Sequence, residues 1–73
     1  MAEKLKSENV ALVSAAGAGT GILAREMGLS TGNQVVDAFA GAAIAVAGYM
    51  TSYDGISDFA EGFGIGYFFD SVL

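Results

Sequence analysis

Two stretches of sixteen residues each, residues 9–24 and 38–53, contain no charged side chain in a chain of only 73 residues. Hydrophobic residues make up 53% of the chain and charged residues 15%, whereas ordinary soluble domains are about 25% charged. A soluble domain this small buries only about 60% of the surface that its unfolded chain exposes. The apolar surplus therefore predicts contact with lipid, with other subunits, or with both.

Helices are the expected way to order these stretches, because the chain has no proline to interrupt them. Gly28 and Gly32 favour positive φ and the end of a helix, and Thr31 or Asn33 is placed to cap the next one. The pair Asp54-Gly55 is typical of a second turn. After it, Ser57 or Asp58 is a candidate cap for a third helix, with Glu61 in a capping-box position.

We predict one all-α domain, a small hydrophobic helical hairpin of two long helices with a third, shorter helix or helical extension. Its expected parts are a polar N-terminus at 1–8, helices at 8–28, 34–51 and 57–72, and turns at 29–33 and 52–56. One long kinked helix over the last two segments is the alternative.

Small residues recur at helical spacing in all three expected helices. Gly17 and Gly21, like Gly62 and Gly66, form G-x-x-x-G pairs, which let two helix backbones approach closely. The predicted helix-packing residues are Ser14, Gly17, Ala18, Gly21, Gly41, Ala45, Gly48, Gly62 and Gly66. We expect subunits to join through these small-residue faces, so that leucines at Gly17 and Gly21 would abolish assembly.

A nucleotide site is the competing interpretation of the first glycine cluster. After apolar residues 10–13, the segment 19–24 fits G-x-G-x-x-A and resembles the opening of short-chain dehydrogenases, which implies a cofactor pyrophosphate on the glycine turn. However, Ser14-Ala15 stands where that family has Thr-Gly, no Tyr-x-x-x-Lys follows, and 73 residues cannot build the sheet. We therefore expect no bound cofactor.

Few side chains suited to catalysis or metal binding are present, because the chain contains no cysteine and no histidine. The usual zinc ligands and the usual thiol or imidazole catalysts are thus missing. Asp54, Asp58 and Glu61 are interpreted as a solvated rim, with loose binding of a hard cation as the alternative. We predict no catalytic residue, no metal site and no enzymatic activity.

Two other charges stand at the edges of the apolar stretches. Asp37 is expected in the first turn of a helix, where the macrodipole stabilises an acid. An acid that carries protons or ions within a membrane is the alternative, similar to rotary ATP synthase proteolipids, although their acid lies mid-span. Arg25, the only cation after residue 6, is interpreted as a local partner of Glu26 or as a charge facing a lumen or loop.

The layout of residues 8–53 resembles two kinds of small hydrophobic helical-hairpin assembly protein: conjugative-type pilins and the capsid proteins of spindle-shaped archaeal viruses. The first resemblance, which we favour, implies a homopolymeric filament for DNA transfer, built from membrane-stored subunits with bound lipid and found outside the cell after assembly. A virion protein and an accessory subunit of a membrane complex are the alternatives. The net charge of −5 argues against sequence-specific nucleic-acid binding, though not against DNA passing through a tube.

Overall fold

Three helices make up the chain in the computed structural model, which describes the backbone of residues 2–73 and the side chains of residues 10–53 and 55–73. They are α1 (Ala2–Glu26), α2 (Gln34–Met50) and α3 (Asp54–Val72), and no strand occurs in residues 2–73. The all-α prediction is confirmed. The segment 19–24 lies inside α1, so it forms no strand-turn-helix of the dinucleotide-binding kind.

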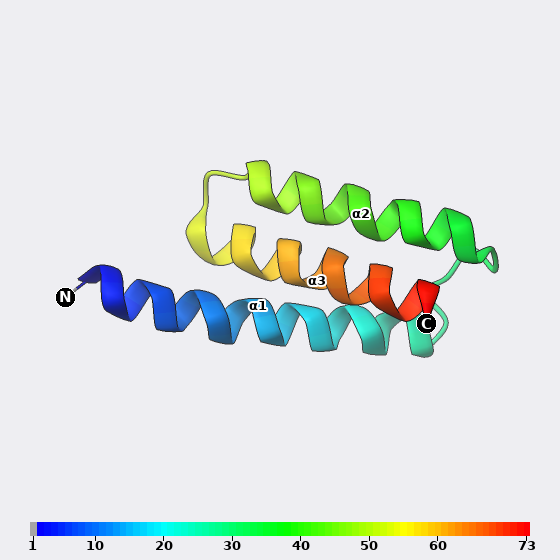
Figure 1. The fold of residues 1–73 in the computed structure, drawn as a ribbon, viewed down its shortest axis with the longest axis horizontal. Helices are drawn as coiled ribbons and strands as arrows, with labels where there is room; N and C mark the ends of the chain where they lie inside the picture. Colours follow the sequence, from blue (N-terminus) through cyan, green and yellow to red (C-terminus); the bar gives the residue numbers. More distant parts are fainter. Residues whose placement is uncertain (1) are drawn as a thin grey trace.

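The helices are arranged side by side with α3 in the middle (Figure 1). The backbone of α3 packs closely against those of α1 and α2, whereas the described parts of the α1 and α2 backbones do not approach one another. α3 runs parallel to α1 and antiparallel to α2 (Figure 1). The first two helices therefore do not form the expected hairpin with each other. The third helix has 19 residues and is longer than α2, which has 17.

The helix boundaries differ from the predicted ones mainly at the starts. α1 begins at Ala2 instead of residue 8, and α3 begins at Asp54 instead of residue 57. Asp54-Gly55 thus forms the first turn of α3, after the cap residue Tyr53, which makes no side-chain capping bond. The two last helices are separate, because Thr51 and Tyr53 are extended.

The link between α1 and α2 follows the sequence signals closely. Gly28 and Gly32 adopt φ values of 111° and 84°, which other residues rarely reach. Asn33 is the N-cap of α2, and its side chain accepts hydrogen bonds from the backbone N–H groups of Val35 and Val36. Ser57, an expected cap, instead donates its hydroxyl to the carbonyl of Gly48 and ties the start of α3 to α2.

Glycines line both sides of α3. A methyl group on Gly62 or Gly66 would collide with the α1 carbonyls of Ser14 and Ala18, while one on Gly64 would collide with Ala45 of α2. Residues 62 and 66 are one helical turn apart, and residue 64 between them points to the opposite side. Alternating glycines thus allow two neighbours to touch the backbone of α3, which places it in the middle.

This open layer encloses almost no hydrophobic core. Tyr67, 5% exposed, is the one large hydrophobic side chain buried among those described. Seven further buried residues are glycines of the two helix seams: Gly17, Gly21, Gly41, Gly48, Gly62, Gly64 and Gly66. The other two are polar, Asp37 and Ser71. Close backbone contact, rather than interdigitated large side chains, holds the three helices together.

Candidate functional site

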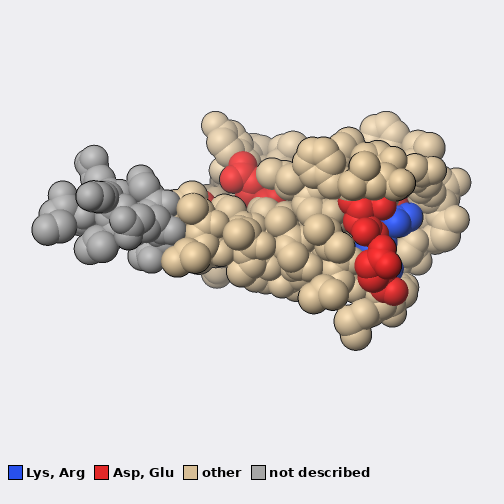
Figure 2. Space-filling model, turned by 60° about the horizontal axis from the view of Figure 1, so that its bottom comes forward, with Lys and Arg blue, Asp and Glu red and all other residues tan. Residues whose placement is uncertain are grey.

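An ion-pair network joins all three helices at the end of the molecule where α1 ends, α2 begins and α3 ends. Arg25 of α1 donates from Nε to Oδ2 of Asp37 on α2 at 3.0 Å. Its Nη1 donates to Oδ2 of Asp70 on α3 at 3.1 Å and to the Asp70 carbonyl at 3.2 Å. Figure 2 shows blue basic atoms beside red acidic side chains at one end of the molecule, with much of the surrounding face uncharged.

Helix dipoles favour this distribution of charges. Arg25 lies at the C-terminal ends of the parallel helices α1 and α3, where a cation is stabilised. Asp37 lies in the first turn of α2, where an anion is stabilised. The network therefore offsets both the repulsion between the parallel dipoles and the cost of burying the charges.

Asp37 is fully buried, yet both of its carboxylate oxygens are bound. Oδ1 accepts the backbone N–H of Thr31 at 2.8 Å and its hydroxyl at 2.7 Å, and Oδ2 accepts the Ser30 hydroxyl and Arg25. The hydrogen bonds from Ser30 and Thr31, joined by Arg25, hold the pKa of Asp37 far below its usual range. A carboxylate held in its charged form this firmly is suited to organising the α1–α2 link, not to carrying protons.

Tyr67 and Glu26 complete the surroundings of the network. The Tyr67 hydroxyl donates to the Leu29 carbonyl at 2.6 Å, and burial raises the pKa of this phenol. Interaction with Asp70 raises the pKa of Glu26. No buried polar side-chain atom among the described residues lacks a hydrogen-bond partner. The arrangement therefore holds the three helices in a defined orientation.

The predicted packing residues all lie at the two seams of α3. Gly17, Gly21, Ser14 and Ala18 face α3 from α1, with Gly62 and Gly66 opposite them. On the other side, Gly41, Ala45 and Gly48 of α2 lie against residues 60–68. The small-residue faces that we expected to join subunits are thus occupied within a single chain.

Asp37 lies in the first turn of α2 as predicted, whereas the other predicted charged residues differ from expectation. Arg25 does not stand free toward a lumen or loop, because its side chain is 21% exposed and lies between two carboxylates. Asp58 and Glu61 are half-buried, and the side chain of Asp54 lies outside the described residues. Within the described part of the chain, no three acidic residues gather into a cluster that would hold a metal ion.

Sequence reasoning missed Gly64, Asp70 and Tyr67, as well as the role of the Ser30 and Thr31 hydroxyls. A signal existed for Gly64, since G-x-G-x-G places glycines on both sides of one helix. Asp70 ends an uncharged stretch at residues 62–69, as Arg25 ends the stretch at 9–24. Each charge thus directly follows an uncharged helical stretch, and this shared position indicates that Arg25 and Asp70 meet when the two helices pack in parallel.

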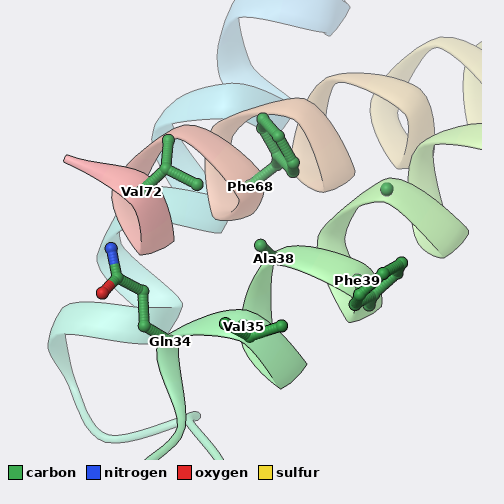
Figure 3. Close-up of a pocket in the computed structure, with 7 residues that line it drawn as sticks. Gln34, Val35, Ala38, Phe39, Phe68 and Val72 are labelled. Atoms are coloured by element: carbon green, nitrogen blue, oxygen red, sulfur yellow. The ribbon is translucent and has the colours of Figure 1, made fainter.

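An apolar groove runs along the seam between α2 and α3. Its first hollow, with a volume of about 480 Å³, is lined by Gln34, Val35, Ala38, Phe39, Ala42, Phe68 and Val72 (Figure 3). A second hollow of about 300 Å³ shares Ala42 and Phe68 with the first and continues past Ala45, Val46, Gly64, Ile65 and Phe69. Neither hollow is lined by a charged residue.

Large apolar side chains cover much of the surface, both along this groove and outside it. Among the described residues, eighteen are exposed: Leu12, Ile22, Leu23, Met27, Leu29, Val35, Val36, Phe39, Val46, Tyr49, Met50, Tyr53, Ile56, Phe59, Ile65, Phe69, Val72 and Leu73. Isolated exposed hydrophobic residues are ordinary, but a continuous apolar surface marks a site of association.

Comparisons with protein-family models, with curated proteins and with solved structures found no match for this chain. Among the described residues, none of the helices is both long and apolar enough to cross a membrane. The resemblance to pilins and viral capsid proteins thus rests on the layout of residues 8–53 alone.

Proposed function

We propose that the protein is a structural subunit that self-associates into a homopolymer through its exposed apolar helix faces. The single observation behind this proposal is the contrast, among the described residues, between eighteen exposed large hydrophobic side chains and one that is buried. The chain exposes 4862 Å², whereas a compact monomer of this mass exposes about 4,200 Å². Covering the excess with further copies would give each chain the core that its own three helices lack.

A filament of the conjugative-pilin type is the form of assembly that we propose, with subunits stored in a membrane and lipid retained beside the apolar faces. The composition supports this form, since lipid and neighbouring subunits both accept uncharged helical surface. The open helical layer supports it too, because both of its faces are free to receive neighbours.

The subunit contacts in this proposal differ from those the sequence suggests. Leucines at Gly17 and Gly21 would fall on the Phe59 and Phe63 carbonyls of the same chain, so that substitution tests folding instead of assembly. An assembly test needs exposed positions, such as Phe39 or Leu12, whose replacement leaves the seams intact.

Electron microscopy and analytical ultracentrifugation of the full chain, purified with and without mild detergent, test the proposal. We expect particles or filaments of identical copies, far above the 7.4 kDa of one chain, that detergent dissociates. A monomer that persists at high concentration without detergent or lipid would refute it. Closed virion-like particles would favour a capsid protein, and a fixed ratio to different chains in native extracts would favour a subunit of a membrane complex.

A further inference from the structure

The groove between α2 and α3 has both parts of an interlocking contact. Small residues form its two hollows: Ala38, Ala42, Ala45 and Gly64. Beside them Phe39 and Phe69 project, with 72% and 52% of their surface exposed. In Figure 3, Phe39 and Phe68 stand on the two helices that border the first hollow. A surface with bulky ridges next to hollows can receive the same surface of another molecule.

The groove also lacks features that would select a different kind of partner. Gln34 is its one strongly polar side chain, and it lies at one end. A charged peptide, a nucleic acid or a lipid headgroup would find no opposite charge along the lining, and the chain as a whole carries a net charge of −5. The partner that this face fits is therefore apolar along its whole length and shaped like the face itself.

The area agrees with one side of a small specific interface. Six lining side chains are between 43% and 72% exposed: Val35, Phe39, Val46, Ile65, Phe69 and Val72. With about 150–200 Å² for a fully exposed side chain of this size, they present roughly 550 Å². Two such faces together approach the roughly 1,200 Å² at which stable interfaces begin, before the partly exposed alanines and Phe68 are added.

We propose that a second copy of the chain packs on the α2–α3 groove, with a two-fold axis near Ala42 and Phe68, where the two hollows meet. This inference rests on the proposed function, since it names the contact through which self-association begins. Gly41 lies beside Phe68 and Ala45 beside Gly64 in the antiparallel pair, so Phe39 and Phe69 stand near the same end of the groove. The two-fold axis crosses the groove and places this aromatic end of one chain over the Ala45 and Gly64 end of the other, so each aromatic ridge lies against the partner's second hollow. The pair buries both grooves, and Leu12, Leu23 and Met27 on and after α1 stay exposed for contacts between pairs.

A charge placed on the groove tests this proposal against a matched position on α1. Phe39→Glu and Leu12→Glu alter side chains that are 72% and 70% exposed, so both variants keep the helix seams. Sedimentation in the same mild buffer should show that Phe39→Glu raises the dissociation constant of the pair by about tenfold or more. Leu12→Glu should leave the pair intact. Wild-type behaviour of Phe39→Glu, or equal weakening by both variants, would overturn the proposal.

Single-cysteine variants give a second readout that does not depend on affinity. The chain has no cysteine, so any disulfide formed by Ala42→Cys must join two copies. Near a two-fold axis the two Cα atoms approach within the roughly 7 Å that a disulfide requires. Under mild oxidation we expect rapid covalent dimers of Ala42→Cys, and slow ones of Ala15→Cys on the exposed face of α1. Faster cross-linking at Ala15 would overturn the proposal.

These experiments distinguish an error about the groove contact from an error about self-association itself. A wild-type chain that stays monomeric refutes both. A wild-type oligomer that Phe39→Glu leaves intact refutes the groove as the contact face and keeps self-association, which then uses another surface such as that around Leu12 on α1.

Discussion

The middle of the molecule and the end near Arg25 are held together by opposite means. In the middle, glycines bring backbones into direct contact, and almost no side chain lies between the helices. At the end, Arg25, Asp37 and Asp70 bury charge and satisfy it with hydrogen bonds. The glycine contacts repeat at every helical turn, so a neighbour displaced by one turn would meet a similar surface. The charged network occurs once, and we expect it to fix which register the helices adopt.

The largest effect that we expect comes from removing the charge of Asp37. In Asp37→Asn the half-buried Arg25 loses one partner, and the amide cannot accept from both Ser30 and Thr31 as the carboxylate does. Thermal unfolding followed by circular dichroism should give the greatest loss of stability in this series. NMR spectra should show more than one packing of helices that remain formed.

Asp58→Asn provides the control for Asp37→Asn, because Asp58 is half-buried at the opposite end of the groove-bearing helix α3. It should leave both stability and spectral dispersion near those of the wild type. Equal effects of the two substitutions would show that the network has no special part in setting the register.

The glycine seams are tested by the same substitution at two glycines. Gly66→Ala adds a methyl group against the Ala18 carbonyl and should destabilise the fold by about 1–3 kcal/mol. Gly19→Ala adds it to an open position in α1 and should stabilise the helix by up to about 1 kcal/mol. Urea unfolding of both variants measures the difference. Stabilisation by Gly66→Ala would mean that the α1–α3 contact is looser than described.

A smaller loss is expected from Tyr67→Phe. This substitution removes the hydrogen bond to the Leu29 carbonyl and leaves the buried ring in place, so it should cost about 1 kcal/mol. Hydrogen exchange should become faster in the link between α1 and α2, with little change in the middle of the helices. Uniformly faster exchange would show that the tyrosine stabilises the whole fold instead of that link.

The smallest effect is expected from Glu26, whose pKa shift is opposite in direction to that of Asp37 and acts at milder pH. The pKa of Glu26 is raised in the folded chain, so its ionised form destabilises the folded state above that pKa. The folded state therefore becomes more stable as the pH falls through the pKa of Glu26. The pKa of Asp37 is lowered, so its contribution is present above the ordinary carboxyl pKa and is lost below it. Stability should therefore peak in mildly acidic solution.

Glu26→Gln checks the first part of that profile. The variant should be slightly more stable than the wild type at neutral pH and should not gain stability on mild acidification. Its loss of stability in strong acid should be unchanged, because Asp37 is still present. If the variant shows the same pH dependence of stability as the wild type, the gain in stability on mild acidification comes from a group other than Glu26.

Much of the fold was accessible from the sequence because the signals are local. Gly28 and Gly32 ended α1 and shaped the link, and Asn33 capped α2, through bonds that span only a few residues. The all-α class followed from the same kind of information. The start of α3 was misplaced because Asp54-Gly55 is a turn signal that this chain uses as the first turn of a helix.

The sequence by itself determined that three helices carry small-residue stripes and that their apolar surface exceeds what 73 residues can bury. Tertiary structure alone decided that the stripes meet within one chain, because a stripe does not specify whether its partner belongs to the same molecule. It also decided that Arg25 reaches Asp37 and Asp70, which lie 12 and 45 residues further along the chain. Such a pairing depends on α3 inserting between α1 and α2, and no local preference of the backbone encodes it.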